Sequence, residues 1–284
     1  MQISAFLGQP YYVAQNLAIN SLSKFGVSDY GLDYVRADFS YLFYLTKQTI
    51  HVARRQKIVD KLPFPPSRLL YLVTRSYDKN SFFLGGCLGA RCIRDTLAKN
   101  GLDMNKFEAI LDFGCGCGRI LRHWNYLRGP EIYGSDYNKI LVNWCQKNLP
   151  FARVSRNELK GKLEYSDGKF DLVYAISVFT HLSESLQDFW LEELTRILKP
   201  GGYLLISLRG TQLKFVGRLA LVKQKFDLGE RVVLESEVSG TNYCNAYHPF
   251  EFVKKWVQPK LKLVDYVPGG AKDANQDFCL LMKP

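Results

Sequence analysis

Residues 111–124 read LDFGCGCGRILRHW and give the clearest indication of the fold in this sequence. It overlaps an apolar run, EAILDF at 108–113, and is followed by apolar residues at helical spacing within 119–128. A continuous apolar run of this length is typical of a strand buried on both faces of a parallel sheet. Glycines in the turn between strand and helix let a ligand approach the backbone closely, because they have no Cβ atom and tolerate positive φ. The segment therefore predicts a strand, a ligand-binding turn and a helix.

The same pattern recurs further along the chain. Four more strands and two more helices are predicted, the strands at 131–136, 152–157, 170–177 and 203–207 and the helices at 137–149 and 184–198. Strands that alternate with helices predict an α/β fold with a Rossmann-like, doubly wound and mostly parallel sheet. Two strands at 261–267 and 277–283 follow a helix at 248–257 without a helix between them. We therefore expect a C-terminal antiparallel β-hairpin.

A helical N-terminal region precedes this pattern. Residues 34–59 carry aromatic and aliphatic side chains at helical spacing, and prolines at 63, 65 and 66 end that stretch. A second helix is predicted over 81–99, ended by Asn100 and Gly101. Its inward face is predicted to carry Phe83, Leu84, Leu88, Cys92, Ile93 and Leu97. The sequence thus predicts two domains, a helical region at 1–104 and an α/β domain at 105–284.

Composition narrows the classes of protein. The chain has 284 residues and a formal net charge of +11, but its basic residues are dispersed, so we do not expect a nucleic-acid partner. Seven cysteines without a repeating spacing favour reduced thiols, and four histidines without nearby ligands do not predict a metal site. No export signal and no apolar stretch long enough to span a membrane are evident, so a soluble, cytoplasmic protein is expected.

The spacing of the glycines separates the possible ligands. Gly114, Gly116 and Gly118 form GxGxG, whereas a dinucleotide fingerprint needs a third Gly or Ala one position later, where this chain has Arg119. No phosphate-binding GxxxxGK[ST] motif occurs. Cys115 and Cys117 are too close in sequence for the usual metal or redox pair, so we interpret them as small residues that fill the loop.

Four motifs occur in the order ILDFGCGCGR, IYGSDYN, FDLVYAISVFTHL and LKPGGYLLIS. Together they resemble those of the class I S-adenosylmethionine-dependent methyltransferases, over roughly residues 106–210, and the C-terminal hairpin extends the likeness. Within that superfamily the chain looks most similar to the bacterial small-molecule or glycan-type branch, which has a helical segment before the core. The resemblance implies S-adenosylmethionine as cofactor and a helical region that selects the acceptor.

The resemblance also implies which residues meet the cofactor. The three glycines would pass beneath its amino-acid part, and Asp112 would order the loop and reach its ammonium group directly or through water. Asp136 lies 22 residues after Gly114, at the end of the second predicted strand, where a carboxylate can accept both ribose hydroxyls. The remaining cofactor positions implied are Tyr137 and Asn157 near adenine, and Ala175, Ile176 and Ser177 near the methionine portion.

The acceptor is less well defined. We predict methyl transfer to a small metabolite or saccharide, to a hydroxyl group, with His181 and His248 as candidate catalytic bases. The [DNS]PP[YFW] and Pro-Cys signatures of nucleobase methylation are missing, which disfavours that class of substrate. Two alternatives remain: a non-catalytic Rossmann-like module that binds nucleotide or RNA, and a nicotinamide-dependent oxidoreductase. The sequence leaves the oligomeric state and the methylated atom open.

Overall fold

The computed structural model describes residues 61–210, 220–258 and 260–284. The chain divides into two compact units, with the boundary between Phe83 and Leu84. The helical stretch predicted at 34–59 lies outside the described residues.

Two helices span the described residues before the sheet. Helix α4, Ser67–Thr74, begins directly after Pro66, whose fixed φ of −51° suits a helix start. Helix α5, Lys79–Lys99, begins where the Asp78 carboxylate accepts hydrogen bonds from the backbone N–H groups of Asn80 and Ser81, at 3.1 and 3.0 Å. It ends at Gly101, whose φ of +76° stops the helix, as predicted.

The buried face of α5 differs from the predicted one. Leu84 and Leu88 are 55% and 37% exposed, so their assignment to the inward face is wrong. The face that packs inward includes Gly86, where an added Cβ would lie 2.0 Å from the carbonyl oxygen of Arg119. The helix therefore approaches the following chain through small residues, and two of its large apolar side chains are left outside.

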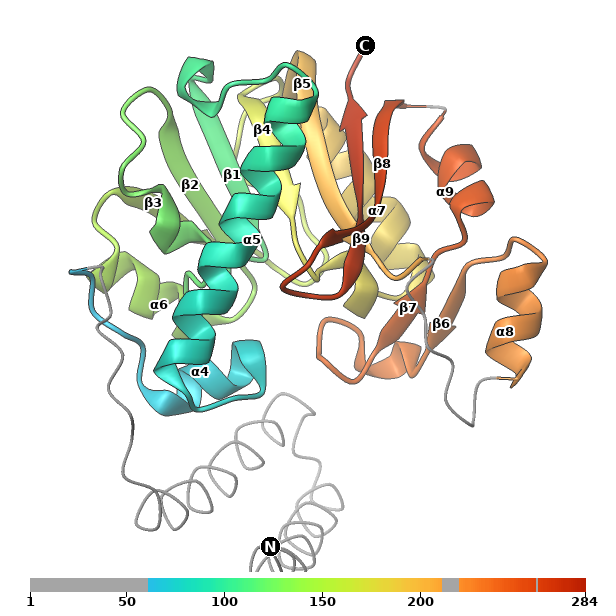
Figure 1. Ribbon diagram of the computed structural model, residues 1–284, viewed down its shortest axis with the longest axis horizontal. Coiled ribbons are helices and arrows are strands. Elements are labelled where there is room, and N and C mark those ends of the chain that lie inside the picture. Colours follow the sequence, from blue (N-terminus) through green and yellow to red (C-terminus); the bar gives the residue numbers. More distant parts are fainter. Residues whose placement is uncertain (1–60, 211–219, 259) are drawn as a thin grey trace, which may run out of the picture. The chain divides into compact units, whose positions relative to one another are not determined.

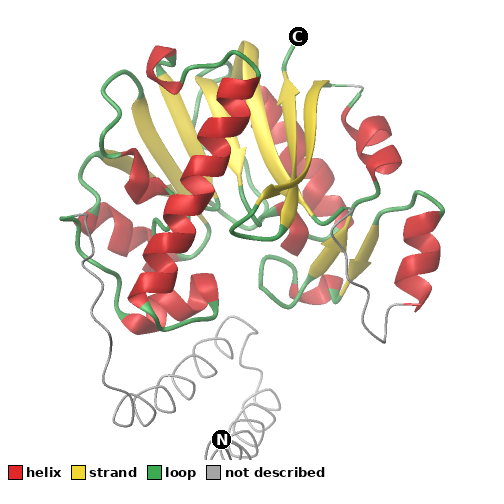
Figure 2. Cartoon of the chain, in the orientation of Figure 1, coloured by secondary structure: helices red, strands yellow, loops and turns green. Residues whose placement is uncertain are grey.

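A seven-stranded sheet forms the centre of the second unit (Figure 1, Figure 2). Its strands are β1 Ala109–Phe113, β2 Glu131–Asp136, β3 Ala152–Arg156, β4 Phe170–Ala175, β5 Leu198–Leu208, β8 Lys262–Ala271 and β9 Gln276–Met282. The order is β3-β2-β1-β4-β5-β9-β8, with β1 to β5 parallel and β9 antiparallel to both β5 and β8. The predicted fold class is confirmed, including the antiparallel hairpin at the C-terminal end.

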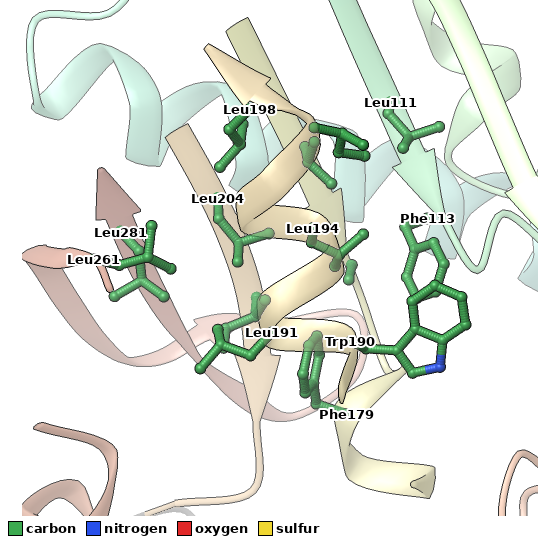
Figure 3. Packing of buried hydrophobic residues seen from close by; sticks show 14 of the residues in the cluster. Leu111, Phe113, Phe179, Trp190, Leu191, Leu194, Leu198, Leu204, Leu261 and Leu281 are labelled. Atoms are coloured by element: carbon green, nitrogen blue, oxygen red, sulfur yellow. The ribbon is translucent and has the colours of Figure 1, made fainter. Parts of the chain in front are cut away.

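Helices cover both faces of this sheet. Figure 1 shows α5 running across one face and α7, Glu184–Ile197, behind the other. The hydrophobic core between the sheet and α7 includes Phe113 and Trp190, whose ring centroids are 4.5 Å apart (Figure 3). Two more helices, α6 Lys139–Asn148 and α9 Phe250–Val257, contribute Leu141 and Val253 to buried positions. This packing fixes the carboxyl ends of β1, β2 and β4, where the candidate site lies.

Three local predictions are corrected. The helix expected over 119–128 is a 3-10 turn, η2 Leu121–Trp124, because the indole of Trp124 turns inward to Tyr174 and Gly129 packs against the backbone of Asn105. The turn expected at 199–202 is part of β5, at an irregularity in its pairing with β4. The glycines at 269 and 270 belong to β8, and the hairpin turns just before Asn275, whose φ is +52°.

A small second sheet lies between β5 and α9 in sequence. It consists of β6 Val232–Leu234 and β7 Asn245–Tyr247, with α8 Ala220–Asp227 before it and the 3-10 turn η4 Ser236–Val238 inside it. The sequence pattern indicated only an irregular basic stretch here. In the described part of the chain, no helix combines the length and hydropathy needed to cross a membrane.

Candidate functional site

The glycine-rich turn after β1 has a conformation that only glycine adopts without strain. Gly114, Gly116 and Gly118 have φ values of +78°, +56° and +78°. An added Cβ would lie 2.3 Å from Val178 Cγ2 at Gly114 and 2.4 Å from Leu149 Cδ1 at Gly118. The turn is thus held closely between the chain after β4 and the end of α6. A side chain at Gly114 or Gly118 would collide with these neighbours.

Asp136, the last residue of β2, binds this turn directly. Its Oδ2 accepts a hydrogen bond from the Gly116 N–H at 2.8 Å, and its Oδ1 accepts one from the Asn138 N–H at 2.8 Å. Burial raises the pKa of Asp136, and these two hydrogen bonds oppose the rise. A carboxylate has about four acceptor positions, so two remain for ligand hydroxyls. This set of donors and acceptors fits the ribose of the implied cofactor.

Asp112, near the end of β1, is buried beside Tyr174. It is 4% exposed and is hydrogen-bonded to Tyr174, whose hydroxyl in turn accepts a hydrogen bond from Trp124 Nε1 at 2.8 Å. Burial raises the pKa of Asp112 to about 7, opposed by the Tyr174 hydrogen bond and the charge of Arg119. The carboxyl group therefore titrates near neutral pH, and a nearby ligand ammonium group would favour its charged form.

The cysteines of the turn are buried packing groups. Cys115 and Cys117 are 5% and 0% exposed, and Cys145 Sγ approaches the Gly116 carbonyl oxygen at 3.4 Å. The hydrogen bond with Cys145 and burial raise the pKa of Cys115 well above its ordinary value, so it stays protonated. Across the described ranges, no three His, Cys, Asp or Glu side chains are grouped so that they could hold a metal ion.

Asn157 follows β3 and is hydrogen-bonded to two residues of β2. Its Oδ1 accepts a hydrogen bond from Ser135 Oγ at 2.8 Å, and its backbone N–H donates to the Asp136 carbonyl oxygen at 3.1 Å. Its Nδ2 donates to the Glu158 carbonyl oxygen at 2.7 Å. The residue thus lies beside Asp136, although its side-chain amide is already engaged within the protein.

A closed ring of hydrogen bonds holds Ser177, directly after β4. Ser177 has a φ of +58°, which is rare for a residue with a side chain. Its N–H donates to Ser207 Oγ at 2.7 Å, Ser207 Oγ donates to Gln276 Oε1 at 2.7 Å, and Gln276 Nε2 donates to Ser177 Oγ at 3.0 Å. Sequence reasoning missed Ser207 and Gln276. Their signal was the presence of polar residues at the ends of two apolar strands.

Ala175, the last residue of β4, has no polar side chain to offer a ligand. Its side chain is buried in the core on the α7 side of the sheet, so only its backbone is available to a ligand.

Gly240, within the small second sheet, connects two predicted site residues. Its carbonyl oxygen accepts a hydrogen bond from the Tyr137 hydroxyl at 2.7 Å, and its N–H donates to the His181 carbonyl oxygen at 2.7 Å. His181 Nδ1 lies 2.8 Å from the Cys244 carbonyl oxygen. Since a carbonyl only accepts, we assign the hydrogen to Nδ1, which makes Nε2 the basic nitrogen.

His248 lies in the interior. Its side chain is 0% exposed, its Nε2 lies 2.9 Å from Gln187 Oε1, and its ring stacks on Trp256 with centroids 6.2 Å apart. Burial, followed by the charges of Arg231 and Arg209, lowers the pKa of His248 to about 3. The ring is therefore neutral at physiological pH.

The carboxyl ends of β1, β2, β3 and β4 thus bring together most of the predicted cofactor residues. Asp136 and Asn157 are hydrogen-bonded neighbours, and both lie beside the glycine turn or the strand that supports it. His181 reaches the same edge through Gly240 and Tyr137. This is the edge at which open α/β sheets bind their ligands.

Comparison with known proteins agrees with this fold. Residues 111–206 match the family model described as a methyltransferase domain. The chain is 28% identical over 123 residues to methyltransferase GfsG of Streptomyces halstedii, covering 39% of this chain and 42% of that protein. It is 29% identical over 145 residues to a ubiquinone biosynthesis O-methyltransferase of a Chelativorans species, covering 48% and 56%. The chain thus spans about half the length of these curated relatives.

Among solved structures, the glycopeptide N-methyltransferase MtfA, complexed with S-adenosyl-L-homocysteine, has a TM-score of 0.50 at 13% identity. The match covers 69% of this chain and 90% of that one, and it shows a common fold. Residues 111–206 thus form a methyltransferase domain, and the chain shares the fold of this solved methyltransferase. The resemblance seen in the motifs is confirmed, as is S-adenosylmethionine as the cofactor of the superfamily.

Proposed function

We propose that this protein transfers a methyl group from S-adenosylmethionine to a hydroxyl group of a small metabolite or saccharide. The observation that carries the proposal is the hydrogen bond from Gly116 N–H to Asp136 at 2.8 Å. It joins the turn after β1 to the end of β2, so that a buried carboxylate with spare acceptor positions lies beside a backbone turn that has no Cβ atoms at its three glycines.

Three groups of this chain would hold the cofactor. Asp136 would accept the ribose hydroxyls, the glycine turn would lie beneath the amino-acid part, and Asp112 would balance the charge of its ammonium group. Tyr137 and Asn157 would border the adenine, and the backbone from Ala175 to Ser177 would border the methionine portion. When bound, S-adenosylmethionine would supply an activated methyl group on a sulfonium. The chain's own residues then have to orient the acceptor and exclude water, which can contribute about 7–11 kcal/mol.

His181 is our candidate general base for a hydroxyl acceptor. The contact between its Nδ1 and the Cys244 carbonyl oxygen at 2.8 Å would orient the ring and leave Nε2 to accept a proton. His248, enclosed and neutral, is better suited to hold Gln187 and the second sheet in place than to meet an acceptor. We therefore assign His248 a positioning role.

The region at 1–104 is proposed to select the acceptor, with the α/β domain at 105–284 holding the cofactor. The relatives with a named function are methyltransferases and include an O-methyltransferase, but also a sterol C-methyltransferase and a phosphoethanolamine N-methyltransferase. A small acceptor in the cytoplasm, rather than nucleic acid, fits a basic charge that is dispersed along the sequence.

Calorimetric titration with S-adenosylhomocysteine tests the cofactor half of the proposal. We expect binding with one site per chain, and a folded protein that does not bind would refute it. Incubation with S-adenosylmethionine carrying a labelled methyl group, together with a metabolite extract, tests the acceptor half. Label should appear in a small molecule, attached to oxygen. Label found only in RNA or protein would contradict the proposed substrate class.

A further inference from the structure

Arg209 follows β5 directly, at the same edge of the sheet as the candidate site. Its Nη1 donates to the carbonyl oxygen of Thr180 at 3.3 Å and to Asn245 Oδ1 at 2.6 Å. Thr180 belongs to the turn after β4, η3 Phe179–His181, and Asn245 begins β7. The guanidinium is thus held one residue away from the proposed base, His181.

No carboxylate neutralises this guanidinium within the described residues. Burial lowers the pKa of Arg209, and the groups that oppose this are the side chains of Tyr247 and Cys244, neither of which is a carboxylate. Two other arginines with little exposure, Arg119 and Arg231, differ in this respect. Arg119 pairs with Asp273 at 2.8 Å, and Arg231 pairs with Asp188 at 2.9 Å.

The free edge of Arg209 has the geometry of an anion site. Both of its protein hydrogen bonds use Nη1, which leaves Nε and Nη2 without a partner among the described residues. Arg209 is partly exposed, and neither nitrogen is among the described polar atoms that are buried and unpartnered. Nε and Nη2 together form the planar edge that binds the two oxygens of a carboxylate in parallel.

A second polar group at this place also lacks a partner. Thr180 is 0% exposed, and its hydroxyl makes no hydrogen bond in the described structure, although its carbonyl oxygen accepts from Arg209. Buried hydroxyls are normally hydrogen-bonded, so an unsatisfied one beside an uncompensated cation points to a group that the protein does not itself supply.

We propose that Arg209 forms an acceptor subsite, and that the acceptor carries a carboxylate group that binds its Nε–Nη2 edge. This inference rests on the proposed methyl transfer, because it names the class of substrate for the same sheet edge. One guanidinium with one free edge matches a single carboxylate, which would anchor the acceptor while another of its groups faces His181.

Matched probes test the subsite before any acceptor is known. Benzoate and benzamide have nearly the same shape, but only benzoate carries a charge. Each is titrated into the full chain while the arginine Nε–H resonances are followed by NMR, with and without S-adenosylhomocysteine. Arg209→Lys identifies the Arg209 resonance by its loss. We expect benzoate to shift this resonance and benzamide to leave it unchanged.

Two variants separate recognition from general charge. Arg209→Met should weaken benzoate binding by about tenfold or more, because a hydrogen-bonded ion pair is lost. Arg153→Met removes an equal charge from an exposed position, where Arg153 pairs with Glu131, and should leave benzoate binding unchanged. The wild-type titration does not depend on the folding of any variant.

The results distinguish the two proposals. An unmoved Arg209 resonance at saturating benzoate, or equal shifts with benzamide, would overturn the subsite even if S-adenosylhomocysteine binds normally. Absence of S-adenosylhomocysteine binding with intact benzoate recognition would instead overturn methyl transfer and with it the role of the subsite as an acceptor site.

Discussion

Arg119 Nη1 and Asp273 Oδ2 lie 2.8 Å apart and join the end of the glycine turn to the β8–β9 hairpin. The Asp273 side chain is 0% exposed and that of Arg119 is 15% exposed. Gly89 of α5 lies against the same carboxylate, with an added Cβ only 2.9 Å from Asp273 Oδ2. One ion pair therefore fixes the glycine turn, the hairpin and α5 against one another.

Loss of the arginine should be costly, because it leaves a buried carboxylate without a counter-charge. We expect Arg119→Met to lower the free energy of unfolding by about 3 kcal/mol, measured by urea denaturation. The double variant Arg119→Met with Asp273→Asn should be more stable than Arg119→Met alone, since the uncompensated charge is gone. A double variant that is less stable, by the sum of the two single effects, would argue against a coupled pair.

The close approach of α5 predicts opposite effects for two neighbouring glycines. Gly86→Ala should destabilise the protein by about 1–3 kcal/mol, because its Cβ would lie 2.0 Å from the Arg119 carbonyl oxygen. Gly85→Ala is the matched control, since its Cβ meets nothing nearer than Arg119 Nη1 at 3.6 Å. At Gly85 the higher helix propensity of alanine should stabilise the protein by up to about 1 kcal/mol. Urea denaturation of both variants measures the difference.

Asp136 should decide cofactor affinity. Asp136→Asn keeps one acceptor oxygen but loses the charge and one of the acceptors, so we expect S-adenosylhomocysteine to bind about tenfold or more weakly by calorimetry. Asp95→Asn removes the same charge from an exposed position on α5, where Asp95 Oδ1 lies 4.0 Å from Arg94 Nε. This control variant should leave the affinity for S-adenosylhomocysteine unchanged. Equal affinity of wild type and Asp136→Asn would exclude Asp136 from the cofactor site.

Asp112 should make stability depend on pH. Its pKa is raised to about 7 in the folded protein, so the folded state binds a proton more tightly than the unfolded state does. The stability that this proton contributes is complete below the unfolded pKa of about 3.9 and is lost as the pH rises toward 7.

Asp112→Asn removes this titration. Thermal unfolding at about pH 5 and about pH 8 should show the variant gaining stability over wild type at the higher pH, by about 1–4 kcal/mol. Calorimetry should show weaker S-adenosylhomocysteine binding by the same variant. A stability difference that does not change with pH would mean that the carboxyl group ionises normally.

His181 should control the rate of methyl transfer without controlling cofactor binding. In His181→Asn the side-chain amide can still donate to the Cys244 carbonyl oxygen, but it cannot accept a proton as a base. With the acceptor identified from labelled extract, we expect the turnover rate to fall about 10²- to 10⁴-fold and the low-pH limb of the rate profile to disappear. S-adenosylhomocysteine affinity should stay unchanged. A profile of unchanged shape would leave His181 without a role as base.

The sheet could be predicted from the sequence because its strands are short apolar runs that alternate with helices. Asp136 and the three glycines were predictable for a similar reason, since their positions follow from the ends of those strands. The short turn at Leu121–Trp124 could not be predicted in this way. The spacing of the apolar residues is the same whether Trp124 packs along a helix or turns inward to Tyr174. Tertiary contact decides between the two.

Long-range polar contacts were also beyond prediction. Ser177 follows β4, Ser207 lies in β5 and Gln276 begins β9, and nothing local in the sequence indicates that these distant residues form one ring. Arg209 and Asn245 meet only because the small second sheet returns to the end of β5. The core of the proposed cofactor site is therefore encoded locally, whereas the proposed acceptor side depends on how the segment that carries β6 and β7 folds back to β5.

Gly240 has a broader consequence. Its two main-chain groups hold Tyr137, on the cofactor side, and His181, on the proposed acceptor side. A change in the length or sequence of this loop would therefore alter the positions of both Tyr137 and His181. In evolutionary terms, new acceptors would be reached more readily through substitutions around Arg209 and in the N-terminal region than by exchanging this loop, because loop exchange would put retention of the methyl donor at risk.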